Sequence, residues 1–174
     1  MGGMMRFINV AIPNGRFLAG ADMVLPEDIK MSDGTVMKKG KRYFTFDELA
    51  ALQSEHKMPY GAVVPTEDEF YQIVSNVIKY IRCNYGYEGC TAVEVLEQSL
   101  GFGMNGWIDA EDMDRYNADP EGFTDVKYVG DCGCYLSDSE GHLGVAILSL
   151  AADGNVSVEY GARGCGFSFR PVTY

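Results

Sequence analysis

Residues 128–139 (YVGDCGCYLSDS) and residues 164–172 (GCGFSFRPV) decide the fold of this chain. Between them, residues 145–150 (VAILSL) turn at Asp153-Gly154 into residues 156–158 (VSV), which predicts a β-hairpin. Apolar residues alternate along these segments with small or polar ones. Such alternation is typical of a buried framework that presents an exposed, interchangeable face, and it favours a binding protein over an enzyme.

The composition indicates a globular protein. The 174 residues are 47% hydrophobic and 22% charged, which suits a single domain over residues 1–174 with a sizeable core. The net charge of −11 repels nucleic-acid backbones and anionic membranes, so we expect no nucleic-acid partner. No apolar run reaches the roughly 18 residues of a membrane-spanning helix, and we expect no membrane insertion.

The five cysteines and the first residues bear on the compartment. An odd number of cysteines without paired spacing predicts free thiols in a reducing environment. Two disulfides stay open as alternatives: Cys132 or Cys134 with Cys165, and Cys83 with Cys90. The start of the chain lacks the long apolar stretch of a secretory signal, so we expect no signal peptide.

The N-terminal part, residues 1–59, carries no motif that we can assign. Residues 5–44 read as short extended pieces, with turns at Asn14-Gly15 and Asp33-Gly34. Val36 to Phe44 is predicted to be an edge strand, because a strand with many basic side chains resists pairing with another chain. Those basic residues are Lys38, Lys39, Lys41 and Arg42.

Three helices are predicted to begin at Thr45, Thr66 and Thr91. Each threonine is followed three residues later by glutamate, so the hydroxyl and the carboxylate can cap each other's backbone N–H groups. The second helix has one apolar stripe with three- and four-residue steps. The stripe consists of Phe70, Ile73, Val74, Val77, Ile78 and Ile81. Gly101 is predicted to end the third helix.

After Gly101 the pattern changes to β. Phe102 to Ile108 is a candidate strand, and residues 109–125 are predicted to form an acidic loop containing Pro120 and Gly122. The rest of the chain reads as strands and turns.

Motifs for metal binding and catalysis are weak. The acids between Asp109 and Asp114 lack the glycine and terminal glutamate of an EF-hand loop, so a solvated acidic loop is the better interpretation. Cys132, Cys134 and Cys165 with His142 lack the usual zinc spacing. No phosphate loop, dinucleotide fingerprint or nucleophile elbow occurs. We therefore expect no enzyme, no metal and no cofactor.

Residues 159–165, EYGARGC, have neither a strand period nor a turn signal. Protein-binding surfaces favour aromatic residues and arginine, with small residues that shape pockets. This segment is therefore predicted to make ligand contacts, and an ordinary irregular loop is the alternative.

Four motifs occur in the order of one known superfamily. Residues 64–70 (VPTEDEF), 103–109 (GMNGWID), 133–139 (GCYLSDS) and 166–172 (GFSFRPV) resemble its LPTxxEW, LxGYRD, GYYWSSS and GFSVRPV segments. The chain is similar to the C-type-lectin-like superfamily, in the branch of formylglycine-generating-enzyme-like and Fibrobacter-succinogenes-major-paralogous domains. The resemblance covers about residues 60–172.

The resemblance implies an α+β, C-type-lectin-like fold, with helices packed around a small twisted antiparallel β-sheet. Residues 60–174 would form its core, with a variable-type ligand-binding region at about 128–170. Leu136 replaces the family tryptophan. The EPN, QPD and WND motifs of calcium-dependent sugar lectins and the RGGSW region of formylglycine-generating enzymes are absent.

The branch includes bacterial surface proteins and phage receptor-binding proteins that retroelements diversify, and this implies two groups of positions. The framework would be Tyr135, Ser137, Leu148, Val156, Arg163, Gly166, Phe167 and Arg170. The ligand-binding positions would be Asp131, Cys132, Cys134, Asp138, Glu140, Ser157, Glu159, Tyr160, Gly161, Ala162 and Cys165.

The sequence therefore predicts a non-enzymatic receptor-binding protein of phage or prophage origin, with a surface that retroelement diversification would make hypervariable. Its partner would be a protein or glycan receptor on a target cell, and a homo-oligomer is possible. We expect it on the phage virion, or in the cytoplasm before assembly. One alternative is a bacterial surface adhesin or structural module that binds glycan or cell wall; another is a thiol- or metal-dependent enzyme.

Overall fold

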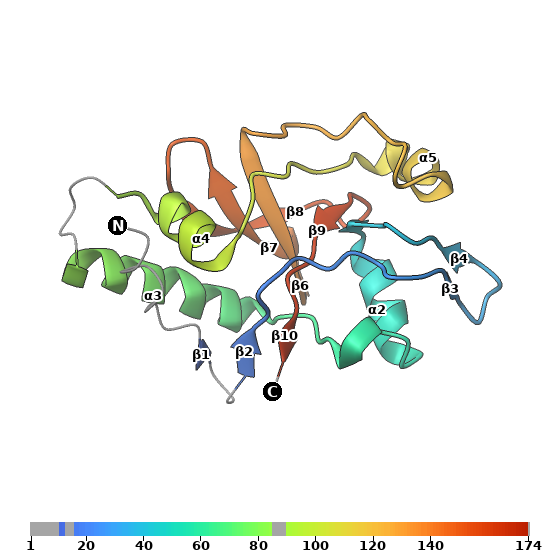
Figure 1. The fold of residues 1–174 in the computed structure, drawn as a ribbon, viewed down its shortest axis with the longest axis horizontal. Helices are drawn as coiled ribbons and strands as arrows, with labels where there is room; N and C mark the ends of the chain where they lie inside the picture. The colour runs from blue at the N-terminus through green and yellow to red at the C-terminus, as the bar shows by residue number, and fades with distance from the viewer. Residues whose placement is uncertain (1–10, 13–15, 85–89, 174) are drawn as a thin grey trace.

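The computed structural model describes residues 11–12, 16–84 and 90–173, and Figure 1 shows their arrangement. The helices are α2 (Phe46–Ser54), η2 (Pro59–Gly61), α3 (Glu67–Asn84), α4 (Ala92–Leu100), η3 (Ala110–Asp112) and α5 (Met113–Ala118). The strands are β1 (Ala11–Ile12), β2 (Arg16–Leu18), β3 (Ile29–Lys30), β4 (Val36–Met37), β5 (Tyr43–Phe44), β6 (Cys132–Gly141), β7 (Gly144–Ala151), β8 (Val156–Gly161), β9 (Phe167–Ser168) and β10 (Val172–Thr173). The predicted α+β class is confirmed.

The three predicted helix starts are confirmed. Thr45 and Glu48 exchange both capping hydrogen bonds at α2, as Thr66 and Glu69 do at α3. At α4, Thr91 accepts from the Glu94 N–H, and its hydroxyl donates to the Glu94 carboxylate. Gly101 ends α4 at φ +68°, a left-handed conformation that glycine adopts without a Cβ clash.

The largest sheet has five strands in the order β5-β9-β6-β7-β8. The predicted hairpin is confirmed, because β7 pairs antiparallel with β8 from Val145–Gly161 to Leu150–Val156. On its other edge β7 pairs antiparallel with β6, and β6 pairs parallel with β9. Alternation along these strands sends neighbouring side chains to opposite faces of the sheet.

The two faces of this sheet belong to different clusters. On one, here called the helix face, Tyr135, Leu148 and Val156 pack with apolar residues of α3 and α4. On the other, here called the cysteine face, Cys134, Leu136 and Ile147 pack with residues of α2 and the N-terminal segment. Figure 1 shows α3 and α4 on one side of the central strands and α2 and α5 on the other.

The N-terminal part, although without an assigned motif, packs with the C-terminal strands. β2 lies between β1 and β10, where Val172 pairs with Leu18. Phe44 at the end of β5 pairs with Phe167 of β9. Residues 16–59 thus contribute to both clusters, so they share the core of the predicted lectin-like segment.

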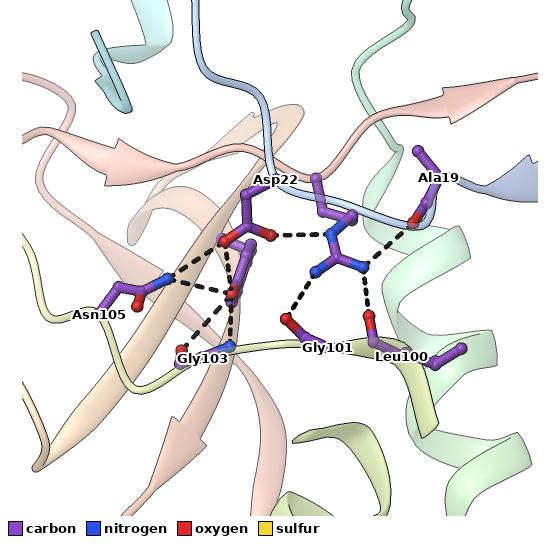
Figure 2. A network of polar contacts seen from close by, with 8 residues as sticks. Ala19, Asp22, Leu100, Gly101, Gly103 and Asn105 are labelled. Carbon is purple, nitrogen blue, oxygen red and sulfur yellow. Dashed lines mark hydrogen bonds and ion pairs between the residues drawn. The ribbon is translucent and has the colours of Figure 1, made fainter. Parts of the chain in front are cut away.

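A buried polar network joins distant parts of the chain around Arg170, which is only 1% exposed. Its guanidinium donates to the Asp22 carboxylate and to the carbonyls of Ala19, Leu100 and Gly101. The same Asp22 carboxylate accepts from the Tyr135 hydroxyl and from Asn105 (Figure 2). Because buried polar groups are costly when unpaired, this network fixes the N-terminal segment, the end of α4 and the C-terminal segment relative to each other.

Three predictions on secondary structure were wrong in part: the strands at 36–44 and 102–108, and the acidic loop at 109–125. Val36 to Phe44 is not one edge strand, because a turn at 38–41, with Gly40 at φ +88°, separates β4 from β5. The predicted strand at Phe102 to Ile108 forms only isolated bridges at its last three residues. Its earlier groups have other partners; for example, Gly103 N–H donates to the Tyr135 hydroxyl.

The predicted acidic loop at 109–125 contains η3 and α5. Met113 and Tyr116, three residues apart, are buried against Ile108 and hold α5 on the protein. The Tyr116 hydroxyl also accepts hydrogen bonds from the N–H groups of Arg42 and Tyr43. The turn at Asp33-Gly34 lies between β3 and β4 as predicted, whereas Asn14-Gly15 lies outside the described residues.

Candidate functional site

Most of the predicted ligand-binding positions reach solvent, but they do not share one surface. The exposed ones are Asp131, Asp138, Glu140, Glu159, Tyr160 and Ala162, and the half-buried ones are Cys132, Ser157, Gly161 and Cys165. Cys134 is only 4% exposed. Its prediction as a contact residue was therefore wrong, because its side chain packs into the cluster beneath the cysteine face.

Strand register brings several of these residues together on the cysteine face. Cys134 pairs with Ser149, which pairs with Ser157. Ile147 pairs with Glu159 on the same side. At the β8 edge this face therefore carries the hydroxyl of Ser157 and the carboxylate of Glu159, which are hydrogen-bonded to each other at 2.9 Å.

The segment after β8 crosses the cysteine face towards β9. Gly166 pairs with Ile108 through two backbone hydrogen bonds. Cys165 packs half-buried on the same cluster as Cys132 and Trp107. The predicted irregular segment 159–165 is thus partly a strand, since β8 extends to Gly161 by pairing with β7, and only residues 162–165 form the loop.

An aromatic pair of the half-buried Trp107 and the exposed Tyr128 borders this face, and the sequence motifs did not predict it. The rings of Trp107 and Tyr128 lie 4.7 Å apart. Trp107 N–H and Lys127 C=O are hydrogen-bonded, and Gly106 allows this approach because a Cβ there would lie 1.9 Å from the Lys127 oxygen. Tyr128 is 55% exposed and the adjacent Val129 is 62% exposed.

Tyr128 also has an unusual backbone conformation. Its φ is +60°, a backbone conformation that residues other than glycine adopt at an energetic cost. The Cys132 N–H donates to the Tyr128 carbonyl and closes the turn that follows Tyr128. The strand β6 begins at Cys132, directly after this turn. The signal in the sequence was a tryptophan and a tyrosine, each beside a glycine or a turn, but only the fold places their rings in contact.

Tyr160, predicted as a central contact residue, lies on the helix face. It pairs with Ala146 in β7, and its hydroxyl donates to the Glu67 carboxylate at the start of α3. This hydrogen bond, with a further one to Tyr71, raises the pKa of the Tyr160 hydroxyl above its ordinary value. The structure therefore separates Tyr160 from Ser157 and Glu159, because neighbouring residues of a strand point to opposite faces.

Asp138 and Glu140 lie at the other end of β6. A β-bulge between Leu136 and Glu140 shifts the register there, and Asp138 N–H donates to the Pro65 carbonyl. Asp138 lines a groove of about 420 Å³ beside Phe46 and Leu49 of α2. These two acids therefore belong to the α2 side of the molecule and not to the aromatic pair.

Arg163, predicted as part of the framework, is exposed and joins two elements. Its guanidinium pairs with Asp47 of α2 at 2.6 Å and with Glu140 of β6 at 2.7 Å, and it stacks over Phe46. The hydrogen bond to Asp47 raises the pKa of the guanidinium. Arg163 thus attaches the crossing loop to the protein at its surface.

The five cysteines are unpaired, in agreement with the prediction of free thiols. Burial raises the pKa of Cys132 and Cys165, and it raises the pKa of Cys134 to about 12. Burial therefore favours the protonated thiol at these three positions, whereas a nucleophile needs the thiolate.

Within the described part of the chain, Asp109, Glu111 and Asp112 form the only close group of three potential ligands. The arrangement of Cys132, Cys134, Cys165 and His142 as a zinc site therefore has no geometric support there. Surface acids of this kind are common without an ion, so the three carboxylates do not by themselves indicate calcium.

Comparison of the chain with protein-family models, with curated proteins and with solved structures found no match. Among the described helices, none is both long enough and apolar enough to span a bilayer.

Proposed function

We propose that this chain is a non-enzymatic ligand-binding protein that presents the exposed edge of its cysteine face, around Tyr128, to a receptor on a target cell. In this proposal the fold is C-type-lectin-like and the protein serves target recognition by a phage or prophage, on the virion or in the cytoplasm before assembly. The face would be open to diversification by a retroelement. It would need no cofactor, and a homo-oligomer would present several copies.

The observation that carries the proposal is the aromatic pair at the edge of the cysteine face, formed by the exposed Tyr128 and the half-buried Trp107. Tyr128 holds a strained left-handed conformation while more than half of its side chain is exposed. Such strain persists only where the surrounding structure enforces it, and it is concentrated at functional sites. Trp107 and Tyr128 are also the residue types that dominate binding energy at protein interfaces.

The neighbours of the pair suit a protein receptor. Val129 adds an exposed aliphatic group, while the exposed Asp131, whose N–H donates to the Tyr128 carbonyl, supplies negative charge beside it. An apolar centre with a polar rim is the ordinary anatomy of a protein-binding surface. Burial favours the protonated form of the thiols at this face, which supports binding rather than thiol catalysis.

The four ordered motifs support the lectin-like fold and its recognition role. Two of them lie where the proposal needs them: residues 103–109 contain Trp107, and residues 133–139 form most of β6. The second candidate is an adhesin that binds glycan or cell wall. The same aromatic pair favours it, because tyrosine and tryptophan combine an apolar ring with a polar group.

The test compares two exposed tyrosines with the same backbone strain. Tyr60 is 84% exposed at φ +58°, but it lies in η2, between α2 and α3, and not in the segments that carry Trp107 and Tyr128. The fluorescently labelled wild-type chain and the Tyr128→Ala and Tyr60→Ala variants are titrated onto intact cells of a panel of bacterial species. We expect saturable binding to at least one species, and a loss of about tenfold or more in affinity for Tyr128→Ala alone.

A second matched pair removes an aliphatic group instead of a ring. Val129→Ser is expected to weaken binding, whereas Val36→Ser, which changes a 46% exposed valine of β4, leaves it unchanged. Pretreatment of the cells with protease abolishes binding to a protein receptor, and pretreatment with periodate abolishes binding to a glycan. Equal binding by Tyr128→Ala and Tyr60→Ala, or binding to no cells of the panel, overturns the proposal.

A further inference from the structure

The basic segment 38–42 is unusual in a chain of net charge −11, and the ligand-binding proposal does not use it. Four of the 14 lysines and arginines lie within these five residues. Two of them have polar partners. Lys38 donates to the Ala118 carbonyl, and the buried Lys41 contacts Asn117 and forms an ion pair with Glu48.

The other two, Lys39 and Arg42, line a pocket of about 660 Å³. Within the described ranges of the chain, neither side chain forms a hydrogen bond or an ion pair, and both are exposed. Lys41 is buried with Asn117 and Glu48 as its partners, so Lys39 and Arg42 are left together at the pocket. Its volume lies within the range of small-molecule sites.

The rest of the pocket is largely apolar. Phe123 and Val126 come from the segment after α5, and Val24, which is partly exposed, faces them from the N-terminal segment. The pocket therefore joins parts of the chain far apart in sequence and shares no residue with the cysteine face. It offers one apolar wall for a ring and one cationic end for an anion.

Glu121 is the only acid among the residues that line this pocket. Its side chain lies directly over Gly40, since a Cβ at Gly40 would be 2.4 Å from the Glu121 carboxylate. This places a negative charge close to the cationic end without an ion pair to either cation. An anionic ligand would compete with that carboxylate for the same electrostatic field.

We propose that this pocket binds a small aromatic anion, with its phosphate or carboxylate held by Arg42 and Lys39 and its ring against Phe123 and Val126. Arginine suits this role because its planar guanidinium can make two parallel hydrogen bonds to such a group. The inference does not depend on the cysteine face or on any receptor.

Phenyl phosphate is the probe, and its binding to the full chain is followed by calorimetry and by amide chemical shifts. We expect saturable binding with a Kd at or below about 1 mM. Arg42→Gln is expected to weaken it about tenfold, the loss of one charge-assisted contact. Glu121→Gln is expected to tighten it about threefold, because a like charge is removed.

Lys79→Gln is the matched control, since it removes the same charge from an exposed lysine of α3. It should leave the affinity unchanged, and inorganic phosphate should bind more weakly than phenyl phosphate because it lacks the ring. Equal weakening by Lys79→Gln and Arg42→Gln would show only general Coulomb attraction and overturn the site. No saturable binding up to about 10 mM also overturns it.

Discussion

Two arginines of the C-terminal segment show how this protein separates its framework from its surface. Arg170 is buried and donates to one carboxylate and three backbone carbonyls. Arg163 is exposed and pairs with two carboxylates at the surface. Both connect distant elements, but only the buried one does so where water cannot replace a lost partner. We therefore expect Arg170 to hold its neighbouring segments rigidly, while residues of the loop around Arg163 can be substituted at little cost in stability.

The largest expected effect is from Arg170→Ala. The substitution leaves Asp22 without its cation and removes the donor from three carbonyls. Breaking a buried ion pair typically costs about 3–5 kcal/mol of the free energy of unfolding, and urea denaturation measures it. Arg170→Lys should recover only part of the loss, because an ammonium group cannot reproduce the fork of hydrogen bonds. A loss no larger than that of Arg163→Ala would remove the distinction between the two sites.

A smaller effect is expected from pH, through the buried thiol of Cys134. Its folded pKa is about 12 against an ordinary 9.0, because burial opposes the thiolate. A raised folded pKa means that the stabilising contribution is present below pH 9 and is lost as the pH rises towards 12, since the unfolded chain ionises first. Between pH 8 and pH 9.5 the wild type should lose roughly 1 kcal/mol more than Cys134→Ala.

This pH dependence is measured by denaturant unfolding of both proteins at several pH values. Cys134→Ala lowers the stability at every pH through lost packing, so the quantity to compare is the slope with pH. Cys165, whose pKa is raised by burial without a contribution from Cys134, cancels from the difference. Parallel slopes would contradict the burial of Cys134 and return it to the exposed surface.

The smallest effect is expected from Arg163→Ala. Exposed ion pairs contribute little to stability, so the free energy of unfolding should stay within experimental error of the wild type. The local attachment of the loop should weaken, and hydrogen exchange at the Cys165 amide, which donates to Ala162, should accelerate. A cooperative loss of stability would instead place Arg163 in the framework, as its resemblance to the family position suggested.

Local signals in the sequence predicted much of the secondary structure. The threonine–glutamate pairs located three helix starts, and Gly101 located one helix end. The alternating apolar residues and Asp153-Gly154 located the β7–β8 hairpin. These predictions succeeded because each depends on hydrogen bonds or steric limits between residues close in sequence.

The wrong predictions have the opposite cause. The acidic composition of 109–125 concealed α5, which depends on Met113 and Tyr116 finding a hydrophobic cluster formed with Ile108. The strand status of Glu159, Tyr160 and Gly161 depends on pairing with β7. The Tyr116 hydroxyl of α5 also needs the N–H of Tyr43, which is 73 residues away in sequence and lies in no local window.

The candidate site was predicted only in part. The sequence by itself determined which residues are small, polar or thiol-bearing near β6 and β8, and which local turns and caps surround them. The tertiary structure alone decided that Cys134 is buried and that Tyr160 faces α3. It also placed Trp107 against Tyr128 and left Lys39 and Arg42 together at one pocket. The reason is physical: strand register and the packing of distant elements fix the direction of each side chain, and neither is encoded by the residue's immediate neighbours.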